Sequence, residues 1–308
     1  MSRQVESRAG SDAWLALAAV SIFWGTTYLA IRFAIETLPP AFVIFARFTM
    51  SGAILLVTAK LRGAHLPKGR ELWTAAACGC LILGIGNAAA VYAEQIIPSG
   101  LAGLFSTFSP FWMTGIEAMM GGEALHAPTI AGMLIGFSGT ALLLLPGGGG
   151  AFGSSTLIGF TIMEIGVVGW TFGSLVQRRQ PMKAHPFVIG GIQQLAAGLL
   201  YIPVVLFVPE HPIVFSQRSV LGLLYLVVFG SIVGYSAFIF AMDRLPVAIV
   251  SIYPYINAVV AMAVGWLFFR EPFGPREWAA MLVIFAGVAI VKWQNGKALA
   301  RGKSTPAA

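Results

Sequence analysis

Residues 86–100, GNAAAVYAEQIIPSG, can be laid without a gap on residues 234–248, GYSAFIFAMDRLPVA. The same constant shift of 148 carries AGMLIGFSGTA at 131–141 onto AAMLVIFAGVA at 279–289. A second overlay, shifted by 146, places Trp24 on Trp170 and Pro40 on Pro186. The first half of the chain therefore reappears as the second half, and the sequence contains an internal duplication.

The composition is that of a protein that spans a membrane several times. Hydrophobic residues make up 57% of the chain and charged residues 10%, and the mean hydropathy is +0.83, far from the values of soluble proteins. Stretches near the ~20 residues that cross a bilayer lie at 13–33, 40–60, 72–94, 100–120, 128–145, 155–177, 187–208, 219–242, 246–269 and 275–294. We therefore predict ten spans, numbered 1 to 10 along the chain, with span 1 retained rather than cleaved as a signal peptide.

The basic residues indicate how the spans are oriented. If the N-terminus is cytoplasmic, fourteen lysine and arginine residues fall on the inner side, and four fall on the outer side: Arg32, Arg218, Arg270 and Arg276. Such an excess marks the cytoplasmic side. Five spans in each half require the two halves to insert in opposite directions. The predicted fold is an all-α polytopic membrane protein of ten transmembrane helices, arranged as inverted five-helix repeats at 12–146 and 155–294.

Three tryptophans lie away from the interfaces that this residue prefers. Trp24, Trp112 and Trp170 are each roughly 16–21 Å from the start of their spans, at 1.5 Å per residue, and Trp24 and Trp170 are repeat mates. One interpretation is an aromatic wall around a central substrate cavity. The alternative is helix packing, with each indole N–H bonded to a neighbouring helix.

Polar side chains occur at comparable depth on other spans. Amides and hydroxyls in hydrocarbon need partners, which are either a substrate or another helix. The candidates for substrate contact on these spans are Asn87, Ser106, Gln193, Tyr235, Tyr253 and Asn257. Pro110 on span 4 and Pro254 on span 9 each remove a backbone hydrogen-bond donor within a span. In transporters, prolines at such places bend gates or expose backbone groups to the cavity.

Ionisable residues within spans are functional candidates by default. Glu164 lies near the middle of span 6 with no basic residue at similar depth, so it is either neutral or faces a watery cavity, and it suits a proton or cation site. Arg47 and Glu94 both lie toward the outer side, where we expect a structural ion pair or a gate contact. We interpret Glu123 and Glu271, repeat mates that precede spans 5 and 10, as structural carboxylates at helix N-termini.

Spans 5 and 10 carry small residues and no charges within the membrane. Span 5 carries Gly132, Gly136 and Gly139, and span 10 carries Ala280 and Gly287 at the positions that pair with Gly132 and Gly139. Small residues permit close helix approach. We predict that each of these scaffold spans packs against its own half. A dimer contact is the alternative, and a monomer is the expected state.

Several stretches together resemble the ten-span drug/metabolite transporter superfamily of the EamA type, and within it the YedA-like exporters. They are FWGTTY at 23–28, Arg47-Phe48, AEQ at 93–95, GWTFGS at 169–174, FGS at 229–231 and YIN at 255–257. The resemblance covers roughly residues 14–292. It implies a multi-pass protein of the bacterial inner membrane, with cytoplasmic termini and a central cavity lined by spans 1 to 4 and 6 to 9. On this resemblance Tyr28 joins the candidate substrate-binding residues.

The function predicted is secondary transport of small aromatic or amphipathic metabolites or amino acids, outward, by alternating access. No phosphate-binding loop is present, so a substrate or ion gradient, with protons as the candidate ion, must supply the energy. No cofactor, metal or nucleic acid is expected. The alternatives are an intramembrane enzyme, for which the chain has no H-E-x-x-H or G-x-S-x-G motif, and a channel.

Overall fold

The computed structural model describes residues 11–121, 126–144, 154–180, 182–208, 210–245, 247–250, 252–271 and 274–302. Within these residues the chain is helical, without strands. Six helices are long and apolar enough to cross a membrane, and two shorter apolar helices accompany them. The predicted all-α membrane fold is confirmed. Glu123 lies outside the described residues.

Helical elements follow one another in ten segments that match the ten predicted spans. The first five segments are α2 (Ser11–Ala34), α3 (Pro40–Leu61), α4–η1–α5 (Gly69–Gly79, Cys80–Asn87, Ala88–Ala93), α6–η2–α7 (Ser99–Phe105, Ser106–Phe108, Ser109–Met119) and α8 (Ala127–Leu144). The second five are α9 (Ser154–Arg179), α10–α11 (Pro186–Leu200, Ile202–Phe207), α12–η3–α13 (Gln217–Tyr225, Leu226–Val233, Gly234–Arg244), α14–α15 (Val247–Val250, Tyr253–Phe269) and α16 (Pro275–Gly302).

Several segments are interrupted at corresponding places in the two halves. The third and eighth segments each contain an eight-residue π-helix, η1 and η3, and these begin 146 residues apart, at Cys80 and Leu226. Pro110 and Pro254 both lie in the first turn of a helix, α7 and α15, where the missing N–H costs no hydrogen bond. Interruptions of this kind change the backbone hydrogen-bond pattern, and π-helical turns are frequent at functional sites.

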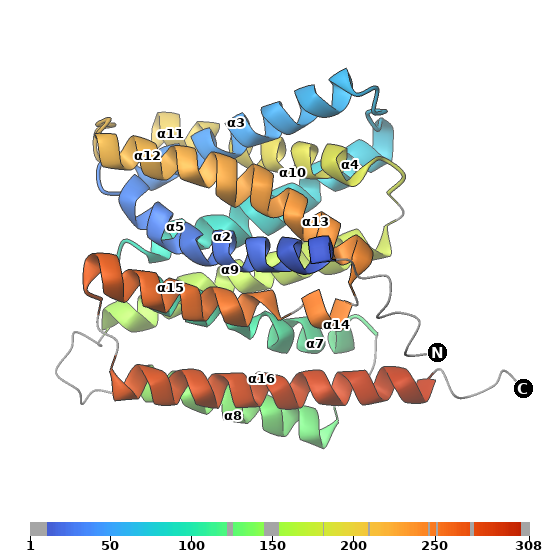
Figure 1. The fold of residues 1–308 in the computed structure, drawn as a ribbon, viewed down its shortest axis with the longest axis vertical. Helices are drawn as coiled ribbons and strands as arrows, with labels where there is room; N and C mark the ends of the chain where they lie inside the picture. Colours follow the sequence, from blue (N-terminus) through green and yellow to red (C-terminus); the bar gives the residue numbers. More distant parts are fainter. Residues whose placement is uncertain are drawn as a thin grey trace, which may run out of the picture.

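The two halves run in opposite directions through one bundle. Helix α2 begins and α16 ends at the same end of the bundle, α2 runs away from that end, and α9 runs back toward it (Figure 1). Following the charge-based prediction, we call this end the inner end and the opposite one the outer end. Helix α2 packs on α12, α13 and α15 of the second half, and α9 packs on the equivalent α4, α5 and α7 of the first.

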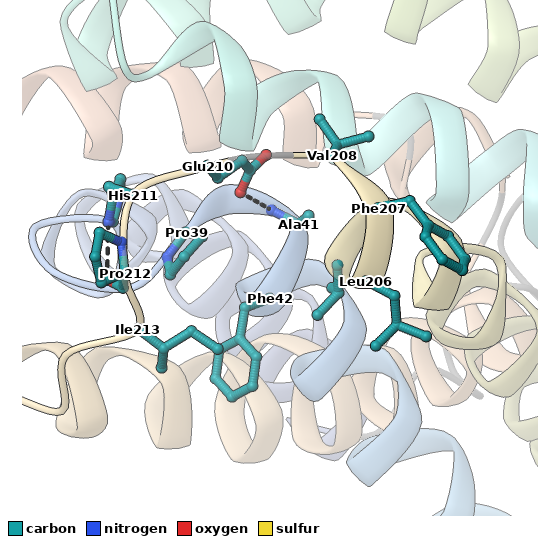
Figure 2. Close-up of a pocket in the computed structure, with 11 residues that line it drawn as sticks. Pro39, Ala41, Phe42, Leu206, Phe207, Val208, Glu210, His211, Pro212 and Ile213 are labelled. Carbon is teal, nitrogen blue, oxygen red and sulfur yellow. Dashed lines mark hydrogen bonds between the residues drawn. The ribbon is translucent and has the colours of Figure 1, made fainter.

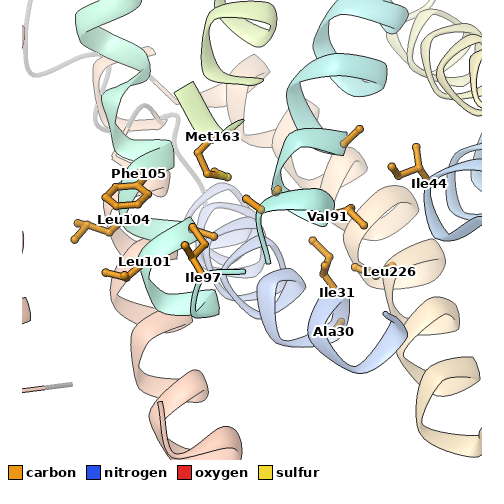
Figure 3. Close-up of a cluster of buried hydrophobic side chains, with 14 of the residues drawn as sticks. Ala30, Ile31, Ile44, Val91, Ile97, Leu101, Leu104, Phe105, Met163 and Leu226 are labelled. Carbon is orange, nitrogen blue, oxygen red and sulfur yellow. The ribbon is translucent and has the colours of Figure 1, made fainter. Parts of the chain in front are cut away.

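A large part of the main hydrophobic core lies toward the outer end. It joins residues near the end of α2, the start of α3, α5 and α6, including Ile31, Ile44, Val91 and Phe105 (Figure 3), and the core continues along α16 as far as Val291. Every residue of α6 is buried, whereas in α7, on the inner side of the same segment, Phe111 alone is buried. The outer end is therefore tightly packed, and the inner part of this segment is not.

Helices α8 and α16 pack against each other, which we did not predict. Each also contacts its own half, as predicted: Phe137 of α8 lies 5.8 Å from Phe111 of α7, and Phe285 of α16 lies 5.3 Å from Tyr255 of α15, centroid to centroid. A side chain on Gly139 would come within 2.9 Å of the Ala280 carbonyl oxygen, and one on Gly132 within 2.9 Å of the Gly287 carbonyl oxygen. The glycines thus let the two backbones approach closely across the halves. The glycine faces that we considered for a dimer are occupied within the chain, and the pair lies at one side of the bundle (Figure 1).

Candidate functional site

A buried guanidinium joins the two halves inside the bundle. Arg47 of α3 is 4% exposed, its Nε donates to Ser231 Oγ of η3 at 2.9 Å, and its Nη1 donates to Asn87 Oδ1 of η1 at 3.0 Å. Gln194 of α10 extends the group, because its Nε2 donates to the Ser231 carbonyl oxygen at 3.4 Å and its Oε1 accepts from Ser51 Oγ. We call Arg47, Ser51, Asn87, Gln194 and Ser231 the polar centre.

The π-helices supply the acceptors of this polar centre. Asn87 is the last residue of η1, and Ser231 lies in η3. Gly230 leaves room for the guanidinium, since a side chain there would come within 3.1 Å of Arg47 Nη2. A guanidinium has five N–H groups, and within the described residues the bonds to Ser231 and Asn87 use the N–H of Nε and one N–H of Nη1. Arg47 therefore retains donors for a further acceptor.

A carboxyl–indole contact also crosses between the halves. Trp112 of α7 donates its indole N–H to Glu164 Oε2 of α9. Glu164 is 7% exposed, and its other oxygen, Oε1, is buried without a hydrogen-bond partner. Two of the predicted site residues are thus in direct contact. One carboxyl oxygen is left for a proton or for a donor group.

Trp24 makes the contacts expected of a packing residue. Its Nε1 donates to the Gly230 carbonyl oxygen at 2.9 Å, and its ring lies 5.1 Å from Tyr253 and 5.3 Å from Phe238, centroid to centroid. Asn257 is buried, and with its amide nitrogen oriented toward the neighbouring carbonyls it donates to Tyr253 O at 3.0 Å and Ser21 O at 2.8 Å. These contacts favour the packing alternative for Trp24.

The remaining predicted residues are distributed over several contacts. Tyr28 meets Ser106 through its hydroxyl, and Gln193 donates to Gln177 at 2.7 Å, apart from the polar centre. The ring of Tyr235 lies directly against the backbone of Gly190 on α10.

Trp170 contacts the other half through its backbone as well as its side chain. A side chain on Gly86 would come within 2.9 Å of Trp170 Cβ. Trp170 is half-buried, and no hydrogen bond of its indole occurs within the described residues, in contrast to Trp24 and Trp112. Its ring is therefore the one of the three that is best placed to face a ligand.

Arg47 and Glu94 do not form the ion pair that we considered. The Arg47 guanidinium is engaged by Ser231 and Asn87, and both Glu94 carboxylate oxygens are buried with no hydrogen-bond partner. Sequence analysis placed both residues at a similar depth but could not assign the face on which each lies. A gate role for the two residues stays a prediction.

Two further residues of the polar centre have identifiable signals in the sequence. Ser231 belongs to the FGS stretch of the resemblance, and Gln194 is a second amide at the same depth as Gln193, of which we had kept only Gln193 as a candidate. Adjacent helical residues point about 100° apart, so only one of the two glutamines can face Arg47. Ser51, one helical turn after Arg47, has no feature in the sequence that indicated a role in the site.

A model of the EamA-like transporter family matches residues 12–145 and again residues 157–293. The chain belongs to the EamA-like transporter family. The predicted family is thereby confirmed, and the protein is a multi-pass membrane protein. Its interrupted, duplicated segments are those of an EamA-like transporter with about ten spans.

Relatives of this EamA-like transporter bear transporter names. The chain is 32% identical to the "Uncharacterized inner membrane transporter YedA" of Escherichia coli (strain K12), over 90% of the chain and 89% of that protein. It is 24% identical to the "Probable terminal-alkyne amino-acid exporter" of Streptantibioticus cattleyicolor, over 96% of the chain and 98% of that protein. A solved crystal structure has the same fold, with a TM-score of 0.64 at 22% identity, over 93% of the chain and 99% of the other.

In this EamA-like transporter, carboxylates cap helices across the two halves at the outer end. Glu271, which precedes α16, accepts from Ser99 N and Ser99 Oγ at 2.9 Å and from Gly100 N at 3.1 Å, at the start of α6. Glu210 accepts from Ala41 N at 3.2 Å, at the start of α3. The structural interpretation of Glu271 is supported, but the helix that it caps belongs to the other half.

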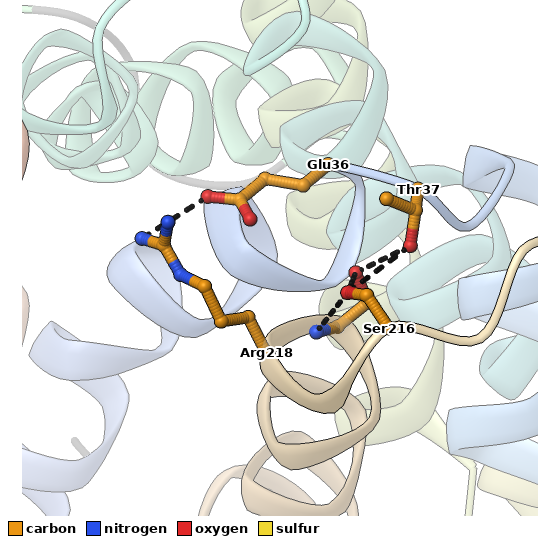
Figure 4. A network of polar contacts seen from close by, with 5 residues as sticks. Glu36, Thr37, Ser216 and Arg218 are labelled. Atoms are coloured by element: carbon orange, nitrogen blue, oxygen red, sulfur yellow. Dashed lines mark hydrogen bonds and ion pairs between the residues drawn. The ribbon is translucent and has the colours of Figure 1, made fainter.

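Hydroxyls and an exposed ion pair add to this closure of the outer end. Thr37 donates to the Val214 carbonyl oxygen at 2.6 Å and lies 2.7 Å from Ser219 Oγ. Arg218 and Glu36 form an ion pair at 3.2 Å (Figure 4). The end of α2 in the EamA-like transporter is thereby joined to the start of α12, so these contacts link the two halves at the outer end.

A pocket of about 510 Å³ lies at the outer end, and it does not contain the predicted site residues. It lies between the start of α3 and the segment that follows α11, with Phe42 and Ile213 on its walls and Glu210 and His211 at its rim (Figure 2). Both Glu210 oxygens are engaged, by Ala41 N and by the Tyr92 hydroxyl at 3.1 Å. The polar centre therefore stays the candidate site of this EamA-like transporter.

Proposed function

We propose that this protein is a secondary active transporter that exports small aromatic or amphipathic metabolites or amino acids by alternating access. The substrate site is the midplane region around the polar centre, and the repeats are residues 12–146 and 155–294. The observation that carries the proposal is the contact of Arg47 with both π-helices, one from each half. A group bound there touches both moving parts of an inverted-repeat carrier.

The chemistry of the site fits a small molecule with one acidic group and an apolar body. Arg47 is the single basic residue deep in a span, so one carboxylate finds a partner, and a phosphate with two charges does not. The aromatic side chains Trp112, Trp170 and Tyr253 offer rings to the apolar part. The name of the relative from Streptantibioticus cattleyicolor, an amino-acid exporter, is consistent with this class.

Protons are the candidate coupling ion in this proposal, and Glu164 is the candidate carrier. Its buried carboxyl group accepts a hydrogen bond from Trp112 on Oε2, and Oε1 has no hydrogen-bond partner among the described residues. The termini face the cytoplasm of a bacterial inner membrane, following the excess of basic residues on that side. The densely packed outer end and the loosely packed α7 correspond to a conformation that is closed to the outside.

Uptake into proteoliposomes tests the proposal directly. Purified protein is reconstituted, and the entry of labelled phenylalanine, tyrosine and tryptophan is followed with and without a pH gradient. A carrier gives saturable uptake and counterflow. A channel gives neither, and a chemically altered product would indicate an enzyme.

Matched serine variants locate the site. Ser231→Ala removes an acceptor of Arg47 and is expected to reduce flux at least tenfold at unchanged yield. Ser138→Ala, on the exposed face of α8 where the hydroxyl bonds only the Ile135 carbonyl oxygen, should have no effect. Equal flux in the two variants would remove the polar centre from the transport site.

A further inference from the structure

Glu94 presents a buried carboxyl group that the transport proposal leaves unexplained. The residue is 0% exposed, directly after the end of α5, and within the described part of the chain neither of its carboxyl oxygens has a hydrogen-bond partner. Ala93 and Ile97 on either side are likewise buried. An ionised carboxylate without partners is very costly in such surroundings.

The two guanidinium groups near Glu94 interact with it electrostatically, but neither forms an ion pair with it among the described residues. Arg32 of α2 donates to the backbone carbonyl oxygens of Glu94 and Ile97 rather than to the carboxylate. Arg47 of α3 is bonded to Ser231 and Asn87. Neither guanidinium comes within ion-pair distance of the Glu94 carboxyl group in the described part of the chain.

A second carboxylate, Glu271, lies near Glu94 and has the hydrogen-bond donors that Glu94 lacks among the described residues. Glu271, from the segment before α16, interacts electrostatically with Glu94 and accepts three hydrogen bonds from Ser99 and Gly100. When two neighbouring carboxyl groups share one proton, the group with donors retains the charge and the group without donors takes the proton. Of the remaining elements packed on α5, α2 contributes the neutral Tyr28, η1 contributes no titratable group near Glu94, and α9 contributes Glu164, which is bonded to Trp112.

We infer that Glu94 is a proton-binding site that controls closure of the outer end. In the closed conformation the carboxyl group carries the proton. When the outer end opens, water reaches the group, the O–H bond breaks, and the proton passes to water on the outer side. Closure then requires a proton from the same side. The inference rests on the proposed alternating access, and it adds that outer acidity favours the conformation closed to the outside.

Only a proton fits the space around Glu94 in the closed conformation. An ammonium group or a metal ion would need room and several further oxygen ligands, whereas Val91 and Ile97, close to Glu94 in the chain, are buried members of the hydrophobic core (Figure 3). In this figure Ile97 and Val91 lie on either side of the end of α5. The group is therefore distinct from the polar centre, where Arg47 donates to Ser231 and Asn87.

Infrared spectroscopy of the reconstituted full chain tests whether the proton is present. At neutral pH the wild type should show the C=O stretching band of a protonated carboxylic acid, and Glu94→Gln should lack part of it. Glu36→Gln, in the exposed ion pair at the same end, should leave the band unchanged. An identical band in wild type and Glu94→Gln would overturn the inference.

Thiol labelling from the outer side tests the link to closure. In a chain with Cys78 and Cys80 replaced by serine, Ile97→Cys reports opening, and the exposed Gln95→Cys corrects for the pH dependence of the maleimide reaction. We expect the corrected labelling of Ile97→Cys to rise several-fold from pH 6 to pH 9. Adding Glu94→Gln, which resembles the protonated acid, should make it low and independent of pH.

The outcomes separate this inference from the transport proposal. If the corrected labelling of Ile97→Cys depends on pH to the same extent in the chain with Glu94 and in the Glu94→Gln variant, the proton site alone is overturned. Ile97→Cys that stays unlabelled at every pH, while Gln95→Cys reacts, would show that the outer end never opens and would overturn both. A failure to transport any amino acid in the liposome assay, with pH-dependent labelling retained, would overturn the transport proposal alone.

Discussion

Replacing Glu271 with alanine is expected to destabilise the protein more than any exposed charge change at the same end. The carboxylate of Glu271 accepts hydrogen bonds from Ser99 N, Ser99 Oγ and Gly100 N. Ser99 and Gly100 are buried at the start of α6, so no water replaces the lost acceptor. The two backbone N–H groups would then remain buried without partners.

The magnitude follows from those two donors. Each unsatisfied buried N–H costs about 1–3 kcal/mol, so Glu271→Ala should lower the free energy of unfolding by about 2–6 kcal/mol. Glu271→Gln retains an acceptor but loses the charge, and we expect a loss of about 1–2 kcal/mol because charge-assisted hydrogen bonds are about twice as strong as neutral ones. Glu36→Ala is the control, since its pair with Arg218 is 28% and 62% exposed and such pairs contribute about 0.2–1 kcal/mol.

Unfolding by sodium dodecyl sulfate in mixed micelles, followed by circular dichroism, measures these differences. The order of transition midpoints should be wild type, Glu36→Ala, Glu271→Gln and Glu271→Ala, from most to least resistant. If Glu271→Ala unfolds at the same detergent fraction as Glu36→Ala, then the cap between the halves does not stabilise the outer end and the reasoning is refuted.

Three further predictions concern the membrane interior. Glu164→Gln should abolish any dependence of transport on a pH gradient while counterflow continues, and proton-linked flux that persists in this variant would exclude Glu164 from coupling. Trp24→Ala should reduce both the protein yield and the transport flux, because the Trp24 indole is hydrogen-bonded to the other half. Trp170→Ala should reduce the flux at least fivefold in the liposome assay while the yield stays near normal. The reverse pattern would contradict both assignments. Gly139→Leu should destabilise the chain by about 1–3 kcal/mol or more through overpacking against α16, and Gly115→Leu, where a side chain meets open space, should cost less than about 1 kcal/mol in the same detergent titration.

Features that depend on the order of residues along the chain could be predicted from the sequence. The ten spans follow from hydropathy, and the duplication predicted equivalent segments, whose interruptions recur in η1 and η3. The depth of Arg47 and Asn87 within their spans also follows from residue count. Such features need no knowledge of which helices are neighbours.

Features that depend on the rotation of a helix about its axis could not be predicted. Gln193 and Gln194 are adjacent, yet only the second joins the polar centre. The glycines of α8 gave the prediction of close packing but not the identity of the partner, α16. Arg47 and Glu94 share a depth without sharing a contact, because charge and depth do not determine the face on which a side chain lies.

The wide turns of η1 and η3 have a mechanical consequence. A hydrogen-bonded π-turn contains one residue more than an α-turn. Each half therefore has one extra residue in its helix next to the Arg47 guanidinium. If one of these turns tightened into α-helix, the residues beyond it would rotate by about 100° and advance by about 1.5 Å. Asn87 or Ser231 would then move out of reach of Arg47, so a change confined to one segment would exchange the hydrogen-bond partners of the arginine.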